Sequence, residues 1–401
     1  MKAEKRVWRS APFRDEAQRV GDALFAFGQA TRTQLRTLAH LTAEDAEAGI
    51  TQLREHGLLT IVEGQRSPVT GVAEPDLVLL TREAGLVVGA EIGRTHITVV
   101  IATAGHEEFA KATVSLSEDA ENQPVKVLQQ TADLIEEILG KNGARLDMVI
   151  GIGLGIPAPV TLEGRFGSTT FLNRWIRELE HTAGEELSRR LGGVCTYLDN
   201  DGSLGALGEY MVGAGQGSEV LLYVKAATGI GAGIVIGGKL YRGVTGTAAE
   251  LGHVSVNNRG DRCTCGNRGC LELYAGGKAL LEEAKRTSPD IASVADLVNR
   301  AKEGNSFCRR SISEAGEHLG AGLGSVVNIL NPDRIVVGGA LSEADQLLLD
   351  PIQGELRISA MPAAVDRLSV VSTQLGGWAS AWGGVARVWR SEELASASTI
   401  G

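Results

Sequence analysis

Residues 219–241 read EVLLYVKAATGIGAGIVIGGKLY, and the fold follows from this stretch. Two apolar runs flank a turn that contains Gly229, Gly231 and Gly233, and two further glycines precede a short third run. The pattern predicts a strand, a glycine turn, a second strand and a hairpin. Glycine lets a backbone turn approach a ligand closely, and the chain contains 52 glycines. A ligand-binding α/β protein is therefore indicated.

An earlier part of the chain has the same pattern. Residues 86–103 (LVVGAEIGRTHITVVIAT) and 107–116 (EEFAKATVSL) predict three strands with tight turns, followed by a helix near Pro124 to Leu139 and a strand at 148–157. Beyond residue 241, a helix around Ala315 to Leu330 leads into the strand RIVVGG at 334–339. Two similar α/β halves with glycine turns predict an actin-like, ribonuclease H-like sugar-kinase fold, with a ligand between two lobes. We expect the last helix, about Trp378 to Val388, to cross back to the first lobe.

Composition limits the function classes. The 401 residues are 43% hydrophobic, and there is no apolar run of 18 residues and no apolar stretch after the initial charges MKAEKRVWRS. We expect a cytoplasmic protein without a membrane partner. The net charge is −10, yet residues 1–40 hold eight Lys or Arg against four Asp or Glu. A basic N-terminal piece on an acidic body fits either a DNA-binding head or a solvated tail.

The N-terminal residues have their own pattern. Apolar positions between Val20 and Leu59 recur at helical spacing and predict three short helices, the third capped by Thr42 and ended by Gly57. LLTIVEGQRSPVTG at 58–71 and DLVLL at 76–80 then predict two strands around a turn-rich loop. Three helices followed by a β hairpin are typical of a winged helix-turn-helix, which we assign to residues 1–82.

Some residues of this unit favour DNA binding, and others argue against it. The candidate contacts to the DNA backbone are Arg32, Arg36 and Thr42. The third helix, however, presents three acidic residues where a groove-reading helix usually shows Arg, Ser, Thr or Asn: Glu44, Asp45 and Glu47. Acidic residues in a first helical turn also favour the helix dipole, so they have a purely structural explanation.

The stretch CTCGNRGC at 263–270 concentrates three of the five cysteines, and a histidine stands ten residues upstream. One imidazole and three thiolates make a closed tetrahedral set, which predicts a structural Zn²⁺. The predicted ligands are His253, Cys263, Cys265 and Cys270. Gly266 and Gly269 would let the loop fold around the ion. The alternative is a group of reduced thiols without metal, and Cys195 and Cys308 are expected to be packing residues.

Together, GTAAELGH at 246–253 and CTCGNRGCLE at 263–272 resemble the signature of the ROK family, which is named for repressors, open reading frames and kinases. The head resembles that of the family's repressor branch. The resemblance implies that Glu250, His253 and Glu272 contact sugar hydroxyls. It also implies that Asn200 and Asp201 lie at the sugar and that, in the family's kinases, the Asp removes the proton of the attacking hydroxyl.

The chain departs from the family pattern at several positions. The family usually has Asn at two positions where this chain has Ser203 and Phe171; Phe171 lies four residues before Trp175. The identity of the family's sugar therefore cannot be carried over to this protein. The wing has QRSPV and GVAEP in place of Gly-Arg-Pro. In the family's kinases the first phosphate turn has a sequence similar to Asp-Ile-Gly-Gly-Thr, whereas this chain has EIGRT. We therefore expect the bulky Arg94 to obstruct the turn that would bind the phosphates of ATP. The second turn, AATGIGAGI at 226–234, matches the family pattern more closely.

The resemblance implies a sugar-responsive transcriptional regulator, most simply a repressor, with kinase activity lost. The body would span residues 83–401, with one lobe of about 83–198 plus the C-terminal helix and another of about 199–375. Expected partners are DNA, a sugar or sugar derivative, and further copies of the chain in a homodimer or homotetramer. The alternatives are a sugar kinase with an appended domain, in which Asp201 would be catalytic, and a ligand-responsive protein that has lost DNA binding.

Overall fold

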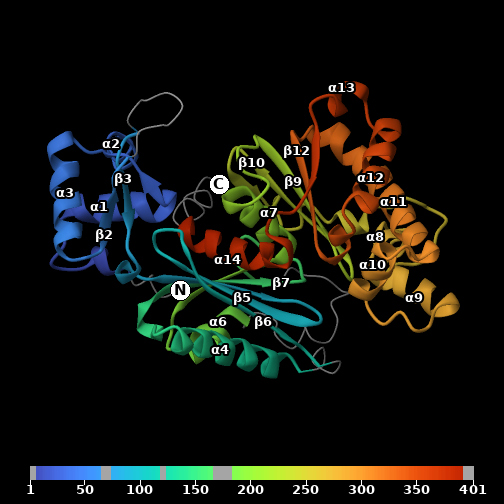
Figure 1. Ribbon diagram of the computed structural model, residues 1–401, viewed down its shortest axis with the longest axis horizontal. Helices are drawn as coiled ribbons and strands as arrows, with labels where there is room; N and C mark the ends of the chain where they lie inside the picture. The colour runs from blue at the N-terminus through green and yellow to red at the C-terminus, as the bar shows by residue number, and fades with distance from the viewer. Residues whose placement is uncertain (1–5, 65–73, 118–122, 166–182, 392–401) are drawn as a thin grey trace.

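The computed structural model describes residues 6–64, 74–117, 123–165 and 183–391. A small N-terminal unit lies at one end, two sheet-based lobes follow, and the helices between residues 272 and 365 lie at the far end (Figure 1). Within the described ranges, none of the helices combines the length and the apolar character needed to cross a membrane.

The N-terminal unit contains three helices and a small antiparallel sheet with the strand order β1-β3-β2. The elements are α1 (Asp15–Phe27), β1 (Gln29–Ala30), α2 (Arg32–Leu38), α3 (Ala43–Glu55), β2 (Leu59–Val62) and β3 (Leu77–Leu80). Thr42 caps α3 as predicted, because its hydroxyl accepts a hydrogen bond from the Asp45 amide at 3.1 Å. The expected wing stretches fall at 65–69 and 71–75, and residues 65–73 lie outside the described residues.

The first lobe is built on a five-stranded sheet with the order β6-β5-β4-β7-β8. Its elements are β4 (Leu86–Ile92), β5 (His96–Thr103), β6 (Glu108–Ser115), α4 (Pro124–Lys141), β7 (Val149–Ile156), α6 (Ala183–Arg190) and β8 (Cys195–Asn200). The pairs β4–β5 and β5–β6 are antiparallel, whereas β4–β7 and β7–β8 are parallel. Parallel strands need a crossover, which α4 and α6 provide on the outer face.

The second lobe repeats this design, with the strand order β11-β10-β9-β12-β13. Its strands are β9 (Val220–Ala226), β10 (Ile230–Ile236), β11 (Lys239–Tyr241), β12 (Arg334–Gly338) and β13 (Ser369–Ser372). The antiparallel and parallel pairs occur in the same positions as in the first sheet. The two similar halves predicted from the sequence are confirmed at the level of topology.

Between β11 and β13 the second lobe carries a loop and a group of helices. The helices are α8 (Glu272–Ala275), α9 (Gly277–Thr287), α10 (Val294–Lys302), α11 (Ser306–Leu330), α12 (Gln346–Ser359) and α13 (Pro362–Val365). The expected start of α11 at Ala315 is wrong. The helix begins at Ser306, because the Asn305 side chain caps it by accepting a hydrogen bond from the Cys308 amide at 3.1 Å.

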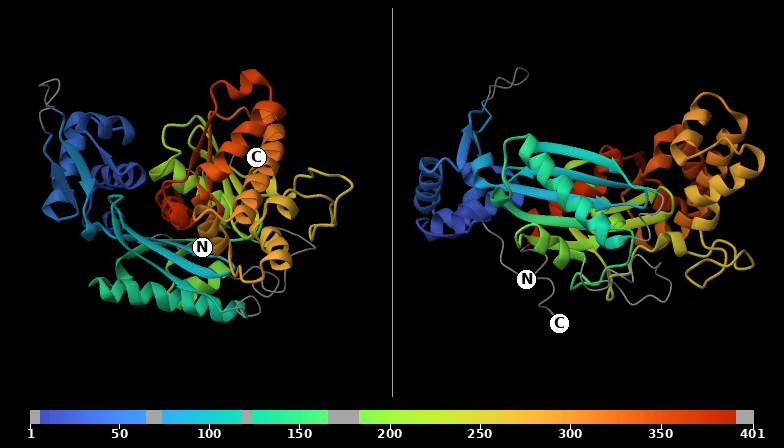
Figure 2. Two further views of the ribbon diagram at one scale, coloured as in Figure 1. Left: turned by 45° about the vertical axis from the view of Figure 1, so that its right-hand side comes forward. Right: turned by 90° about the horizontal axis from the view of Figure 1, so that it is seen from below.

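Two helices, α7 (Asp201–Val212) and α14 (Ala379–Trp389), lie between the sheets and connect the lobes. The predicted final helix does cross back to the first lobe: α14 packs on β4 and β7. Glycines permit the close approach, since a Cβ at Gly89 would lie 1.8 Å from the Ala381 carbonyl oxygen and one at Gly383 would lie 1.8 Å from that of Leu204. The head packs against the first lobe, away from α9 and α10 (Figure 2).

Candidate metal centre and ligand-binding cleft

The four predicted metal ligands come together. One ligand atom from each of His253, Cys263, Cys265 and Cys270 lies within 4.8 Å of the others. His253 ends a short 3₁₀ helix (Leu251–His253), and the cysteines lie on the loop that leads to α8. Gly266 and Gly269 both have positive φ, at 95° and 61°, which bends the loop as expected.

The spacing and chemistry of these donors fit a tetrahedral metal ion. The Sγ atoms of Cys265 and Cys270 are 3.6 Å apart, as are Cys263 Sγ and His253 Nδ1. A disulfide would require about 2.05 Å between sulfurs. Zinc with Zn–S bonds of about 2.3 Å holds neighbouring tetrahedral ligands about 3.8 Å apart. Burial, together with the neighbouring cysteines, raises the pKa of the Cys270 thiol to about 12, so a cation is needed to keep this thiol ionised.

Two of the predicted sugar-contacting carboxylates lie beside this loop. Glu272 Oε1 is 3.5 Å from His253 Nδ1 and accepts a hydrogen bond from Cys263 Sγ at 3.2 Å. Glu250 Oε2 is 3.9 Å from His253 Nε2, so the two imidazole nitrogens face different acids. Burial raises the pKa of the Glu250 carboxyl; His253 opposes the shift, and the charges of Asp201 and Glu272 add to it.

Asn200 and Asp201 mark the junction where β8 ends and α7 begins. The Asn200 side chain caps α7 by accepting from the Ser203 amide at 3.0 Å, and it donates to the Ala158 carbonyl oxygen at 3.1 Å. Asp201 is buried, and its Oδ1 accepts from the Gly202 amide at 2.8 Å. The start of α7 and the 3₁₀ helix that ends at His253 both pack on β10, so the strand-end pair and the metal loop lie against the same strand.

Sequence reasoning missed Lys225, which lies beside Asp201. Its Nζ donates to Asp201 Oδ2 at 2.7 Å and to Glu91 Oε1. The sequence does hold a signal, because Lys225 interrupts the otherwise apolar strand VLLYVKA. A second missed group is Asp199, which pairs with Arg242 and lies 4.0 Å from Arg387 of α14. The expected positions Phe171 and Trp175 lie outside the described residues.

The two phosphate turns differ in their surroundings. In the first, Arg94 is exposed on the turn between β4 and β5. In the second, between β9 and β10, the carbonyl oxygens of Ala227 and Thr228 accept from the amides of Gly277 and Lys278 at 2.8 and 2.9 Å. The first amides of α9 are therefore already paired. Glu272 Oε2 is 3.4 Å from the position of a Cβ at Gly229, so the metal loop also contacts this turn.

The three candidate DNA contacts lie on α2 and at the start of α3. Arg36 and Thr42 are exposed. Arg32 is engaged inside the head, with its Nε 3.2 Å from Glu47 Oε2 and its Nη1 3.4 Å from Asp76 Oδ2. Two of the three acidic side chains of α3 thus have structural partners: Glu47 holds Arg32, and Asp45 accepts from the Thr42 hydroxyl at 2.7 Å.

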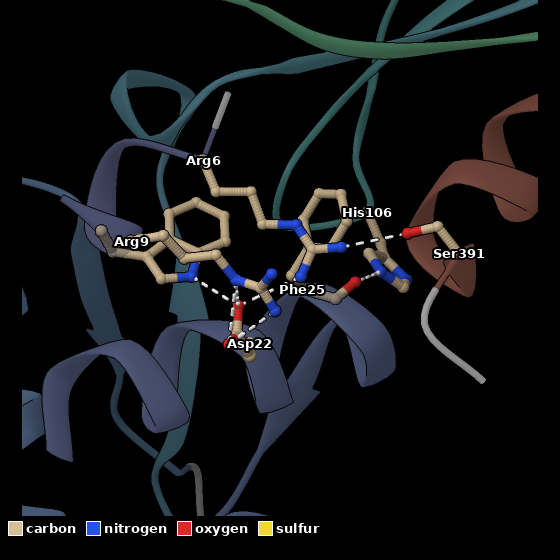
Figure 3. Close-up of polar contacts among 7 residues, drawn as sticks. Arg6, Arg9, Asp22, Phe25, His106 and Ser391 are labelled. Carbon is tan, nitrogen blue, oxygen red and sulfur yellow. Dashed lines mark hydrogen bonds and ion pairs between the residues drawn. The ribbon is translucent and has the colours of Figure 1, made fainter. Parts of the chain in front are cut away.

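The head is joined to the body by polar contacts, which Figure 3 shows, and by an aromatic contact. His106, on the turn between β5 and β6, donates from Nε2 to the Phe25 carbonyl oxygen of α1 at 2.8 Å. Its ring stacks on Trp389 of α14, with centroids 3.6 Å apart. The buried Arg6 donates to Ser391 at 3.1 Å and pairs with Asp22 at the same distance. Burial lowers the pKa of His106 to about 4, against a smaller opposing effect of its hydrogen bond, so the imidazole is neutral.

The doubled sheet topology and the central helices define a two-lobed α/β protein of the sugar-kinase type. The chain belongs to the ROK family, whose model matches residues 87–390.

Relatives of known structure or name fall into regulators and kinases. The chain is 28% identical to the xylose repressor of Caldicellulosiruptor bescii, over 89% of this chain and 91% of the repressor. A ROK family transcriptional regulator, a homologue of the Escherichia coli Mlc protein, superposes with a TM-score of 0.72 at 24% identity, over 94% of this chain and 96% of that one. A glucokinase from Streptomyces griseus, in complex with glucose and AMPPNP, has a TM-score of 0.62 and 29% identity, over 75% of this chain and 98% of the kinase.

Proposed function

We propose that this protein is a sugar-responsive transcriptional regulator, acting as a repressor in the cytoplasm. The head, residues 1–82, binds DNA through a winged helix-turn-helix in which α2 and α3 are the paired helices and β2 and β3 begin and end the wing. The body, residues 83–401, binds a sugar or sugar derivative between its lobes, about 83–198 with α14 and about 199–375.

One observation carries this proposal. The xylose repressor aligns along 89% of the chain, whereas the glucokinase structure covers 75% of it while being matched over 98% of its own length. The kinase therefore accounts for the two-lobed body and leaves a piece of the size of the head unmatched. A regulator structure that covers 94% of the chain includes that piece.

The charge of the head supports backbone contacts of modest strength. Residues 1–82 contain eleven Lys or Arg and eleven Asp or Glu. Because the acidic residues offset these cations, the head gains little from electrostatics alone, so we expect DNA affinity to depend on two heads that bind together. A homodimer or homotetramer supplies those heads, and we infer that sugar-induced lobe closure changes their spacing through the junction of His106, Trp389 and Phe25.

The sugar site is proposed at Asn200, Asp201, Glu250, His253 and Glu272. A structural Zn²⁺ held by His253, Cys263, Cys265 and Cys270 would fix the loop and give the flanking Glu250 and Glu272 fixed positions. Carboxylates held in this way are preorganised acceptors for neighbouring sugar hydroxyls. His253 would bind the metal through Nδ1, the nitrogen nearer to Cys263, and present Nε2 toward Glu250.

A DNA-binding measurement tests the regulator function. The full chain is titrated against DNA from upstream of its own gene at about 50 mM salt, with and without a panel of pentoses, hexoses and amino sugars. We expect sequence-selective binding that one sugar weakens at least about tenfold, equal to about 1.4 kcal/mol of coupling. If the protein binds a sugar but no DNA at this salt concentration, the head serves another partner and the regulator function is wrong.

The kinase alternative has one observation in its favour, since Asp201 occupies the position expected of the base that accepts a sugar hydroxyl proton. It predicts ATP turnover in the presence of a hexose. Phosphorylated sugar above the background of an Asp201→Asn variant would support it over the regulator proposal.

A further inference from the structure

Lys225 is a partly buried cation that the proposed function does not use. Its side chain is 16% exposed and lies between Asp201, 11% exposed, and Glu91, 2% exposed. Glu91 belongs to β4 in the first sheet, Lys225 belongs to β9 in the second, and Asp201 begins the helix that packs between them. These three residues form an ionic bridge across the two lobes, which we call the Lys225 bridge.

The energetics of burial indicate that the Lys225 bridge depends on all three charges. Removing a lone ammonium from water costs several kcal/mol, and only close opposite charges offset that cost. Burial alone would lower the pKa of Lys225, but Asp201 and Glu91 outweigh it and raise the pKa, so the side chain stays charged. Two carboxylates with one ammonium leave a net charge of −1, which disfavours an anionic ligand at this point.

The Lys225 bridge lies next to both phosphate turns in the sequence. Glu91 lies two residues before Gly93 of the first phosphate turn, and Lys225 lies immediately before the second. In the Streptomyces griseus glucokinase, this fold holds glucose together with AMPPNP. Phosphates between two such turns carry a negative charge and need cations to balance them. Here a cation of the protein itself already links the elements that carry both turns.

We propose that Lys225 is a positioning residue that ties β4 to β9 and holds Asp201 in place for a sugar hydroxyl, so that the cleft binds its sugar without a nucleotide. The proposal rests on the proposed function for the class of ligand. The bridge between the lobes does not depend on that assignment.

The experiment compares the wild type with a variant that removes the ammonium together with one carboxylate, so that the net charge of the three positions stays at −1: Lys225→Met combined with Glu91→Gln. Lys225→Arg keeps the charge, and Lys239→Met, at an exposed position on β11, controls for loss of a lysine. Calorimetry measures binding of the most tightly bound sugar of the panel, with and without 5 mM Mg-AMPPNP, chosen as about five times a 1 mM Kd. Small-angle X-ray scattering reports the separation of the lobes.

We expect wild-type sugar affinity to be unchanged by Mg-AMPPNP. The double variant should lose at least about tenfold in affinity and scatter as a more open molecule, while Lys225→Arg and Lys239→Met stay near wild type. Nucleotide binding by the wild type with a Kd below about 1 mM would overturn the proposal, as would a double variant with wild-type affinity and scattering. If no sugar binds, the proposed function fails, and the scattering comparison still decides whether the bridge holds the lobes.

Discussion

Cys265 is the partly exposed member of the metal cluster, whereas Cys263 and Cys270 are buried. Replacing Cys265 by Ser removes one soft ligand and leaves the apolar core intact. We expect the zinc content of purified protein to fall from about one ion per chain toward background, and the Tm to fall by several degrees, because metal binding and folding of the loop are coupled. Elemental analysis and calorimetry measure the two effects.

Cys308→Ser is the matched control, since Cys308 is buried in α11 and lies outside the cluster. It should lower the Tm through packing while retaining the zinc. Equal zinc loss in both variants would contradict the assignment of the ligands.

Arg36 and Arg32 give a second test with single side chains. Arg36 is exposed on α2, whereas Arg32 is held by Glu47 and Asp76. We expect Arg36→Ala to weaken DNA binding for all sequences and to reduce the slope of log affinity against log salt by about 1. Arg32→Ala should change that slope less. Identical slopes for the two variants in fluorescence anisotropy would argue against this placement of the DNA backbone.

How far the site could be predicted depends on how near its residues lie in the sequence. His253 and the three cysteines fall within 18 residues, and a local motif is enough to group them. Lys225 and Glu91 are 134 positions apart, so only the arrangement of the two sheets brings them together. The lysine in VLLYVKA signals an unusual environment, but nothing in the sequence names its partners.

For the helices and strands too, local signals were predictable and long-range pairing was not. The start of α3 follows from the Thr42 cap and was predicted, since capping depends on residues three positions apart. β1 has only two residues and exists because β3 pairs with it, which no local pattern reveals. Residues 306–314 of α11 lacked an obvious signal other than Asn305, because this part of the helix includes the polar stretch Arg309, Arg310 and Ser311.

The approach of α14 to the first sheet gives a test at this level. A methyl group added at Gly89 would lie 1.8 Å from the Ala381 carbonyl oxygen, so Gly89→Ala forces helix and strand apart. We expect a loss of about 3 kcal/mol or more in the free energy of unfolding, since overpacking a rigid contact between backbones leaves little room to relax. Denaturant unfolding measures it.

Gly354→Ala in α12 is the opposite case, because no described atom outside the adjoining turns of its own helix lies within 4 Å of the added methyl group. It should stabilise the protein by about 0.5–1 kcal/mol, the helix propensity of Ala over Gly. A stabilising Gly89→Ala would contradict the described packing of α14.

At the level of the whole molecule, the head and body are joined through a histidine that is kept neutral. The pKa of His106 is about 4 in the folded protein, below its ordinary value near 6.5, because burial disfavours the imidazolium. The unfolded chain therefore takes up a proton as the pH falls from 6.5 toward 4, whereas the folded chain does not. We expect the free energy of unfolding to fall by about 1.6 kcal/mol between pH 6.5 and pH 5 from this group.

His106→Asn isolates that contribution. Residue 106 has φ of 70°, a conformation that Asn tolerates better than most residues, and Asn does not titrate. The variant should show a shallower pH dependence than the wild type by the stated amount, with the carboxyl groups contributing equally to both. Parallel curves would mean that His106 is not held neutral at the junction.

Helix α14 completes the first lobe and also touches the head, although some 180 residues of the second lobe separate it in the sequence from β8. During synthesis the ribosome makes β4 and β7 long before the helix that covers them. One apolar face of the nascent first sheet therefore stays uncovered until α14 has been synthesised up to residue 389. A premature stop codon anywhere upstream of α14 should give a chain that chaperones retain or proteases degrade, with no shortened but working product.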